Sequence, residues 1–448
     1  MRIYAVLFAI GLVVYGALAG ERLFKQSGAP HFMLQADAWL HGQVHVDPPL
    51  SADDWATIET VALDDGTVVR GRRMVTKPLF HTTGGEDLPT KRIAQSRGYT
   101  AYVSFPPFPS VLMLPSALIA GRGASDVLVT VFVAALILPL CFLMLRKLAA
   151  AGHSQRTVRD DLWLTGTLAF GSVLFFSAVR GEVWYTAHVV GVVLALLYAW
   201  ASIDAEHPLV AGLALGAAAL TRTSMAFMLP LFLYELWRTR NDRRWQRLAW
   251  FVAPIVAFAI AGMIYNHVRF GAPTEFGHSF LALGNHQPVR QQYEIEKWGL
   301  AGPHYLMRNL AVAFLQLPEP HTNAMINGHG LALWFTTPLL FLLVWPKRRG
   351  GLHVALWVTV VLVALPSITY MNSGWFQFGY RFSLDYMVFL IMLLAIGGRP
   401  LGRVAQGLIV FGVIVNLFGA YTFGRKWQYY GRDYDHIHVL GGVTTVAN

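Results

Sequence analysis

Long apolar runs separated by short polar segments alternate along most of the chain. A helix that crosses a membrane needs roughly 20 consecutive, mostly apolar residues. The runs lie at about 3–19, 108–121, 125–145, 161–179, 184–203, 209–221, 223–237, 248–265, 330–345, 352–370, 384–397 and 404–421. This pattern predicts an all-α polytopic membrane protein with about eleven transmembrane helices, forming a single domain over residues 1–448.

Basic residues gather in the short loops between the runs, at 146–159, 238–247, 346–349 and 399–403. Because basic loops stay on the cytoplasmic side, we expect a cytoplasmic N-terminus and two long extracytoplasmic segments, 20–107 and 266–329. If every run crossed, loop 238–247 would lie outside, so one run does not cross on its own.

Two arrangements have eleven crossings instead of twelve, and in both the C-terminus is extracytoplasmic. Either the run at 108–121 is re-entrant, or residues 209–237 form one broken helix interrupted by Thr221-Arg222-Thr223. The first arrangement keeps every basic loop inside, whereas the second places loop 146–159 outside. The sequence leaves both open.

The first long external segment has the pattern of a folded loop. Residues 31–42 read HFMLQADAWLHG and place apolar side chains at helical spacing, which predicts an amphipathic helix on the membrane surface. Asp65-Gly66 lies between two β-prone runs and predicts a small hairpin. Pro106, Pro107 and Pro109 then break regular structure before the next apolar run.

Composition supports the membrane assignment. Hydrophobic residues make up 55% of the chain and charged residues 13%, against about 25% charged residues in soluble proteins. The net charge of +10 lies largely in the short loops, so it indicates membrane orientation and predicts no nucleic-acid partner. The single cysteine, Cys141, lies in an apolar run and allows no intrachain disulfide.

Ionisable residues beside apolar runs are costly to keep there and are therefore candidates for function. Asp37, in the predicted surface helix, is either a general base or a solvated carboxylate on the polar face. Arg222 interrupts a long apolar stretch. It is a candidate phosphate ligand, because guanidinium binds phosphate oxygens bidentately, or an arginine that reaches the interface from a hairpin tip.

Two further clusters combine charge with aromatic residues. Arg180 and Glu182, followed by Trp184 and Tyr185, form either an interfacial belt or the wall of a polar cavity. Residues 374–382 read GWFQFGYRF. There, Trp375 and Arg381 are candidates for stacking on a sugar and holding a phosphate, and the alternative is an interfacial girdle in which Arg381 pairs with Asp385.

The end of the run at 248–265 carries a polar cluster that either faces the first external segment or simply orders the helix exit. Its members are Tyr265, Asn266, Arg269 and Glu275. The histidine pairs at 41 and 45 and at 436 and 438 lack a third ligand at fixed spacing. No metal site or cofactor is therefore predicted, and dependence on a divalent metal stays open.

Five short motifs follow one another along the chain: ADAWLHG at 36–42, FPPFP at 105–109, LTR at 220–222, YNHVRFG at 265–271 and GYRF at 379–382. In this order they resemble the bacterial polytopic glycosyltransferases of the GT-C superfold, akin to the protein O-mannosyltransferases and the lipid A aminoarabinose transferases. The resemblance spans roughly residues 1–420.

This resemblance implies a transferase in the bacterial cytoplasmic (inner) membrane. It would move a sugar from a polyprenyl-phosphate donor to an acceptor hydroxyl, on a lipid, glycan or protein, at the extracytoplasmic side. A carboxylate of the first external loop would act as general base, which maps to Asp37. Basic residues would hold the departing phosphate, which maps to Arg222 and Arg381, and the cluster at 265–275 would line the cavity.

The chain departs from the resemblance at one place. Many relatives carry an acid at the start of the first loop, where this chain reads SGAPHF. The base is then Asp37, or Asp47 or Asp53, or it is absent and the scaffold has another role. A transporter or lipid flippase is the main alternative, favoured by the interrupted segment 209–237, and a non-catalytic envelope protein is a third.

Overall fold

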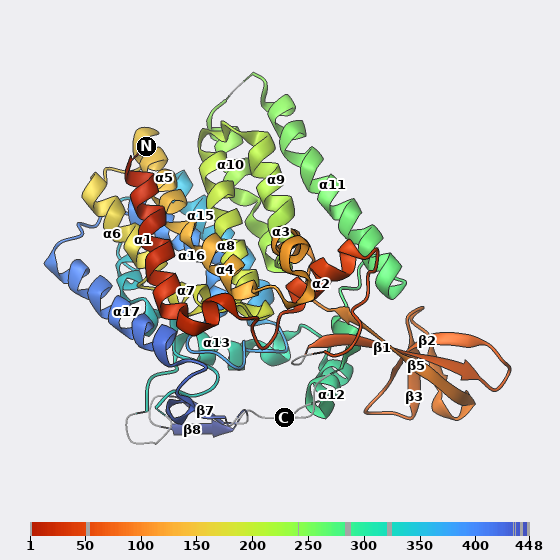
Figure 1. Cartoon of the computed structure of the whole chain (residues 1–448). Helices are drawn as coiled ribbons and strands as arrows, with labels where there is room; N and C mark the ends of the chain where they lie inside the picture. Colours follow the sequence, from red (N-terminus) through yellow and green to blue (C-terminus); the bar gives the residue numbers. More distant parts are fainter. Residues whose placement is uncertain are drawn as a thin grey trace.

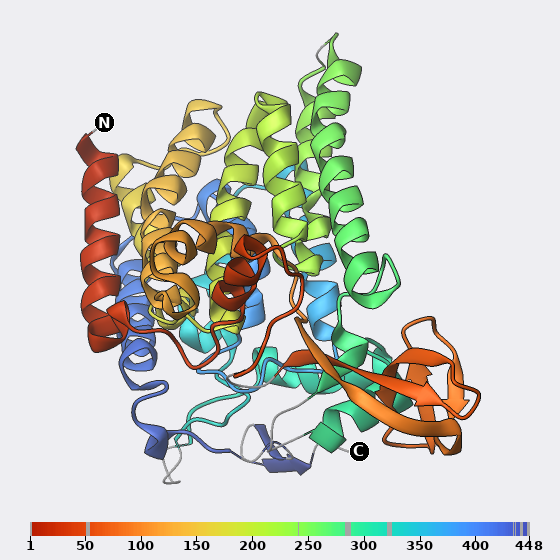
Figure 2. The same cartoon turned by 45° about the vertical axis from the view of Figure 1, so that its right-hand side comes forward.

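The computed structural model describes residues 2–50, 54–240, 242–282, 288–319, 325–432, 434, 436–439 and 442–445. Helices form a tall bundle, and an antiparallel sheet projects from one end of it (Figures 1 and 2). Six helical segments in the described residues are long and apolar enough to cross a membrane: Arg2–Phe24, Asp126–Ala150, Val183–Ala205, Arg244–Phe270, Gly351–Ile368 and Arg403–Thr422. These segments support a multi-pass membrane protein, whereas the count of about eleven crossings stays a prediction.

The centre of the bundle consists of α8 (Val183–Ser202) and α16 (Leu384–Ile396). Every residue of α16 is buried, and so are most residues of α8. Both helices are apolar nearly all round, which is the pattern expected of helices enclosed by other helices. Around them stand α1 (Arg2–Ala19), α4 (Asp126–Ala135), α5 (Ile137–Ala150), α6 (Val158–Ala169), α15 (Gly351–Ile368) and α17 (Arg403–Thr422).

The interrupted segment 209–237 is a hairpin of two helices. α9 (Pro208–Ala219) ends before Thr221, a short 3-10 helix (Thr223–Met228) follows, and α10 (Pro230–Arg238) returns beside it (Figure 1). α9 packs on α11 (Arg244–Phe270) through Gly212 and Gly216, where an added Cβ at Gly216 would meet the ring of Phe258 at 2.6 Å. Small residues let membrane helices approach closely. The reading of 209–237 as one broken helix is therefore wrong.

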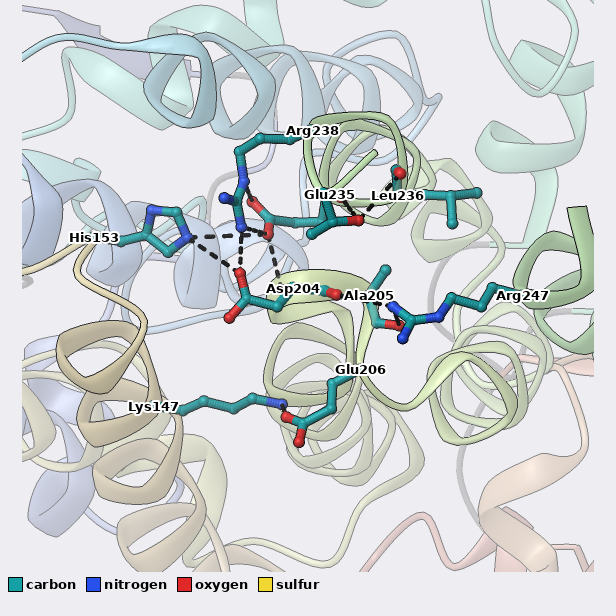
Figure 3. A network of polar contacts seen from close by, with 10 residues as sticks. Lys147, His153, Asp204, Ala205, Glu206, Glu235, Leu236, Arg238 and Arg247 are labelled. Carbon is teal, nitrogen blue, oxygen red and sulfur yellow. Dashed lines mark hydrogen bonds and ion pairs between the residues drawn. The ribbon is translucent and has the colours of Figure 1, made fainter. Parts of the chain in front are cut away.

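A polar network joins the basic loops on one face of the bundle, as Figure 3 shows. Lys147 pairs with Glu206 at 2.7 Å, and Arg238 pairs with Glu235 at 2.7 Å. Arg247 donates to the carbonyl of Ala205 at 3.1 Å. These contacts bring the loops at 146–159 and 238–247 to the same end of the molecule.

The two remaining basic loops lie on this face as well. Arg156 donates to the carbonyl of Leu394 at 2.7 Å, and the amide of Lys347 donates to the carbonyl of Gly397 at 2.8 Å. Arg399 donates to the carbonyl of Trp345 at 2.5 Å. All four basic loops thus share one face, in agreement with the arrangement in which residues 108–121 do not cross.

The sheet belongs mainly to the first long segment, 20–107. It contains β1 (Trp55–Leu63), β2 (Val68–Arg73), β3 (Leu79–Thr82), β4 (Asp87–Pro89), β5 (Ile93–Val103) and β6 (Leu281–Ala282). The strand order is β4-β3-β2-β1-β5, and β6 pairs with β1. The predicted hairpin is present: Asp65 accepts from the amide of Thr67 at 2.8 Å, and Gly66 has a φ of 81°. The other strands were not predicted, so the all-α assignment needs correction.

The amphipathic helix of this segment exists as α2 (His31–Leu40), but protein covers it. Phe32, Met33 and Ala36 pack with residues of α3 (Phe108–Ala120), while Leu34 and Ala38 pack with the start of the sheet. Apolar residues on both sides of the helix have partners within the chain, so its apolar face packs on protein. Its position at a membrane surface stays a prediction.

Besides the pairing of β6 with β1, one carboxylate attaches segment 266–329 to segment 20–107. Glu296 of α12 (Pro288–Trp298) accepts from the amides of Val75 and Thr76, from the hydroxyl of Thr76 and from Arg72. Burial by itself would raise the pKa of Glu296, but hydrogen bonds from Thr76, Arg72 and the two amides outweigh it and lower the pKa. The ionised carboxylate therefore holds α12 against the turn between β2 and β3.

The docking of α12 should weaken in acid. A carboxylate whose folded pKa is depressed contributes stability above its unfolded pKa, about 4.3, and loses it as the pH falls through the folded value. We expect hydrogen exchange of residues 288–298, corrected for intrinsic rates, to accelerate below about pH 4. Glu296→Gln should accelerate this exchange at neutral pH and remove the pH dependence. Identical protection in the variant and the wild type would contradict this role.

The topology can be tested with single cysteines on a Cys141→Ala background. Thr67 lies exposed in the hairpin of the sheet, whereas Asp242 lies exposed between α10 and α11 among the basic loops. In intact cells, Thr67→Cys should react with an impermeant maleimide, and Asp242→Cys should react only after permeabilisation, because basic loops stay inside. The opposite labelling pattern would show that the protein has the opposite orientation in the membrane.

Candidate active site

A cavity of about 350 Å³ lies where the sheet meets the ends of the helices. Segments far apart in the sequence form its wall: the start of β1, the hairpin tip between α9 and α10, the chain before β6 and the stretch after α15. The polar and aromatic side chains that line it include Asp54, Ser104, Trp184, Arg222, Ser224, His278, Tyr370, Asn372, Trp375 and Arg381. A carboxylate and two guanidiniums thus line one cavity.

Asp54 supplies the carboxylate. Trp184, in the first turn of α8, donates its indole N–H to Oδ2 of Asp54 at 2.7 Å, and the hydroxyl of Ser104 donates to the backbone carbonyl of Asp54 at 2.7 Å. The residue has a φ of 69°, a left-handed conformation that costs energy for a non-glycine residue and often marks a functional position. The sheet and the bundle therefore hold Asp54 jointly.

Arg222 enters the cavity from the tip of the α9–α10 hairpin. Its Nε donates to Oδ1 of Asp385 at 2.6 Å, and its guanidinium lies 5.2 Å from the ring centre of Phe382. Among the described residues, its terminal nitrogens have no hydrogen-bond partner. They can therefore bind an anion in the cavity.

Arg381 is held without a carboxylate partner among the described residues. It donates to the backbone carbonyls of Gly374 and Phe376, and its guanidinium lies 5.6 Å from the ring centre of Tyr185. Burial lowers the pKa of Arg381 to about 10, so the group stays charged at neutral pH. The alternative interpretation, in which Arg381 pairs with Asp385, is not what the described residues show, because Asp385 pairs with Arg222.

His278 is a second proton acceptor in the wall of the cavity. Burial lowers the pKa of His278, and the nearby charges of Arg222 and Arg269 lower it further, while Glu275 opposes the shift. The imidazole is therefore neutral at physiological pH. Its segment is ordered by Glu275, whose carboxylate accepts from the amide of Gly277 at 2.6 Å.

Three of the predicted site residues line this cavity: Arg222, Trp375 and Arg381. Asp37 does not line it; its carboxylate lies 3.9 Å from the imidazole of His41, which directly follows α2. Asp47 pairs with His45 at 3.5 Å outside the cavity, and Asp53 lies outside the described residues. Asp54 was not predicted, although it follows Asp53 directly.

Arg180 and Glu182 form a structural pair at the start of α8. Nε of Arg180 donates to Glu182 at 2.9 Å, and its Nη1 donates to the carbonyl of Phe423 at 2.9 Å, just beyond α17. The guanidinium also lies over the rings of Tyr185 and Phe423. The pair ties α8 to α17, and neither residue lines the cavity.

The polar cluster at the end of α11 joins elements to one another instead of lining the cavity. Tyr265 accepts from Gln35 and from Trp39 of α2, each at 3.0 Å. Arg269 donates to the carbonyl of Val103 in β5 at 2.7 Å and to Asn266 at 2.9 Å. This cluster therefore fixes α2 and the sheet to the bundle.

One group of side chains among the described residues has the spacing of metal ligands. His153, Asp204 and Glu235 place three ligand atoms within 4.8 Å of one another on the basic face. Arg238, however, pairs with both carboxylates (Figure 3). A cation is already supplied by the chain at this position, so the group fits a salt-bridge cluster better than a metal centre.

Neither a scan against family models nor a search of curated proteins found a match. Two solved structures are similar over most of this chain. ArnT from Cupriavidus metallidurans, bound to undecaprenyl phosphate, shares 14% identity with a TM-score of 0.42; the match covers 88% of this chain and 59% of that one. The oligosaccharyltransferase of Archaeoglobus fulgidus, in the apo form, shares 12% identity with a TM-score of 0.46; the match covers 95% of this chain and 56% of that one. The chain thus spans less than two thirds of the length of each.

The structural role of Arg269 leads to a prediction. Arg269→Lys removes the planar fork and leaves buried acceptors unsatisfied, which costs about 1–3 kcal/mol. We expect a lower melting temperature in detergent or nanodiscs, with Arg97→Lys, an exposed change on β5, as the matched control. Equal melting temperatures for the two variants would show that the contact between α11 and β5 contributes nothing.

Proposed function

We propose that the chain is a membrane glycosyltransferase that moves a sugar from a polyprenyl-phosphate donor to an acceptor hydroxyl on the extracytoplasmic side. The observation that carries the proposal is one cavity with the carboxylate of Asp54 and the guanidiniums of Arg222 and Arg381 on its walls. This arrangement suits a reaction that removes a proton at one place and releases a phosphate at another.

The reaction assigns each group a role. Asp54 accepts the proton of the acceptor hydroxyl as its oxygen attacks the anomeric carbon of the donor sugar. The bond between that carbon and the phosphate oxygen breaks, and the electron pair leaves with the lipid phosphate. Arg222 and Arg381 stabilise the phosphate as negative charge develops on it. Trp375 and Trp184 offer aromatic faces at the cavity wall for the sugar.

Asp54 replaces Asp37 as the proposed general base. The hydrogen bond from Trp184 orients the carboxylate, and Asp54 is near enough to Arg381 and Tyr370 to interact electrostatically with both. Asp37 has no comparable relation to either arginine in the described contacts. His278 is the other group in the cavity that can accept a proton.

The donor proposal is tested first by binding. The protein in nanodiscs should melt at a higher temperature with undecaprenyl phosphate than with undecaprenol, which lacks the phosphate. Arg381→Ala should abolish the difference, and Arg222→Lys should reduce it because the planar fork is lost. No stabilisation of folded wild-type protein by any polyprenyl phosphate would overturn the proposal.

The base is tested by donor consumption. Asp54→Asn should slow release of polyprenyl phosphate from a polyprenyl-phospho-sugar by at least about a hundredfold, the usual loss for a general base, while leaving lipid binding intact. Asp37→Asn is the control and should turn over normally. His278→Asn decides between the two acceptors of the cavity. A lipid flippase would bind the phosphate equally well but would release no polyprenyl phosphate from the donor in the wild type or in any variant.

A further inference from the structure

Three hydrogen bonds converge on a single buried carboxylate behind Arg222. Asp385, in the first turn of α16, is 1% exposed. Its Oδ1 accepts from Nε of Arg222 at 2.6 Å and faces Nδ1 of His188 at 3.0 Å, while its Oδ2 accepts from the hydroxyl of Ser224 at 2.7 Å. Two central helices of the bundle, α8 and α16, and the hairpin tip thus meet at one side chain.

The geometry decides which edge of Arg222 faces the cavity. Nε is bonded to Asp385, and the flat guanidinium lies against Phe382 at 5.2 Å from the ring centre. The terminal nitrogens then form the edge that is left for a ligand. Arg222 and Ser224 line the cavity, whereas Asp385 and His188 lie behind it.

His188 fixes the carboxylate in turn. An ionised carboxylate only accepts hydrogen bonds, so Nδ1 of His188 carries the proton that it donates to Asp385. Nε2 of His188 is buried and has no hydrogen-bond partner in the part of the chain that the structure describes. In a neutral imidazole this nitrogen is unprotonated, which leaves one positive charge, that of Arg222, to balance Asp385.

We infer that Asp385, supported by His188 and Ser224, is a positioning residue that holds the terminal edge of Arg222 toward the anionic group of the substrate. It acts through Arg222 and does not contact the substrate itself. The identity of that anion as a lipid phosphate rests on the function proposed above; the positioning does not.

A ligand-free measurement tests the positioning. In uniformly ¹⁵N-labelled protein in lipid, solid-state NMR should show a distinct Nε–H signal of Arg222, assigned by its loss in Arg222→Lys. Asp385→Asn should shift this signal toward that of an exposed arginine. An unchanged signal in folded Asp385→Asn would overturn the inference, whatever the ligand of the cavity is.

Binding of undecaprenyl phosphate gives the second readout. Asp385→Asn should weaken it by about tenfold, corresponding to about 1.4 kcal/mol. In an Arg222→Met background, Asp385→Asn should cause no further loss, because residues that act as a unit are not additive. Additive losses would overturn the inference. If the wild type binds no polyprenyl phosphate, the proposed donor fails while the NMR result still decides the positioning.

A matched control separates positioning from stability. Asp161 is an equally buried aspartate paired with Arg146 at 2.6 Å, near the basic loops. Asp161→Asn should lower the melting temperature without changing the Arg222 signal or lipid binding. If Asp385→Asn does not fold, Ser224→Ala decides in its place: a shifted Arg222 signal supports the inference, and an unshifted signal overturns it.

Discussion

A charge inside an apolar helix bundle must find a partner within the protein, because lipid and tightly packed apolar side chains offer none. Asp385 meets this constraint with Arg222, His188 and Ser224. The ion pair joins the tip of the α9–α10 hairpin to the first turn of α16. Other features of the candidate site follow from it, since it places a guanidinium edge at the end of the bundle where the cavity lies.

The same constraint is met differently by two buried arginines. Arg381 and Arg269 are held by backbone carbonyls and aromatic rings, with no carboxylate partner among the described residues. Their roles nevertheless differ. Arg269 donates its hydrogen bonds to β5 and to Asn266 of its own helix, so it connects α11 to the sheet. Arg381 lines the cavity, where its charge is available to an anionic group.

The two long segments, 20–107 and 266–329, complete the cavity from the side opposite the bundle. β1 begins directly after Asp54, and β6, from the second segment, pairs with β1. Glu296 adds a second attachment between the two segments through the turn after β2. A carboxylate from one loop and guanidiniums from helix ends therefore face one space, although about 170 residues separate Asp54 from Arg222.

The sequence by itself determined the apolar helices, the shared face of the basic loops, the break at Thr221-Arg222-Thr223, the hairpin at Asp65-Gly66 and the candidacy of Arg222, Trp375 and Arg381. Each of these rests on local hydrophobicity, charge or turn chemistry, which acts over neighbouring residues. Only the tertiary structure decided that Asp385 pairs with Arg222 and not with Arg381, that α2 is covered by protein, that strands surround the hairpin, and that Asp54 lies in the cavity instead of Asp37. The reason is that ion pairing, burial and the meeting of residues in one cavity depend on which distant segments come together. Neither the periodicity nor the composition of the sequence contains that information.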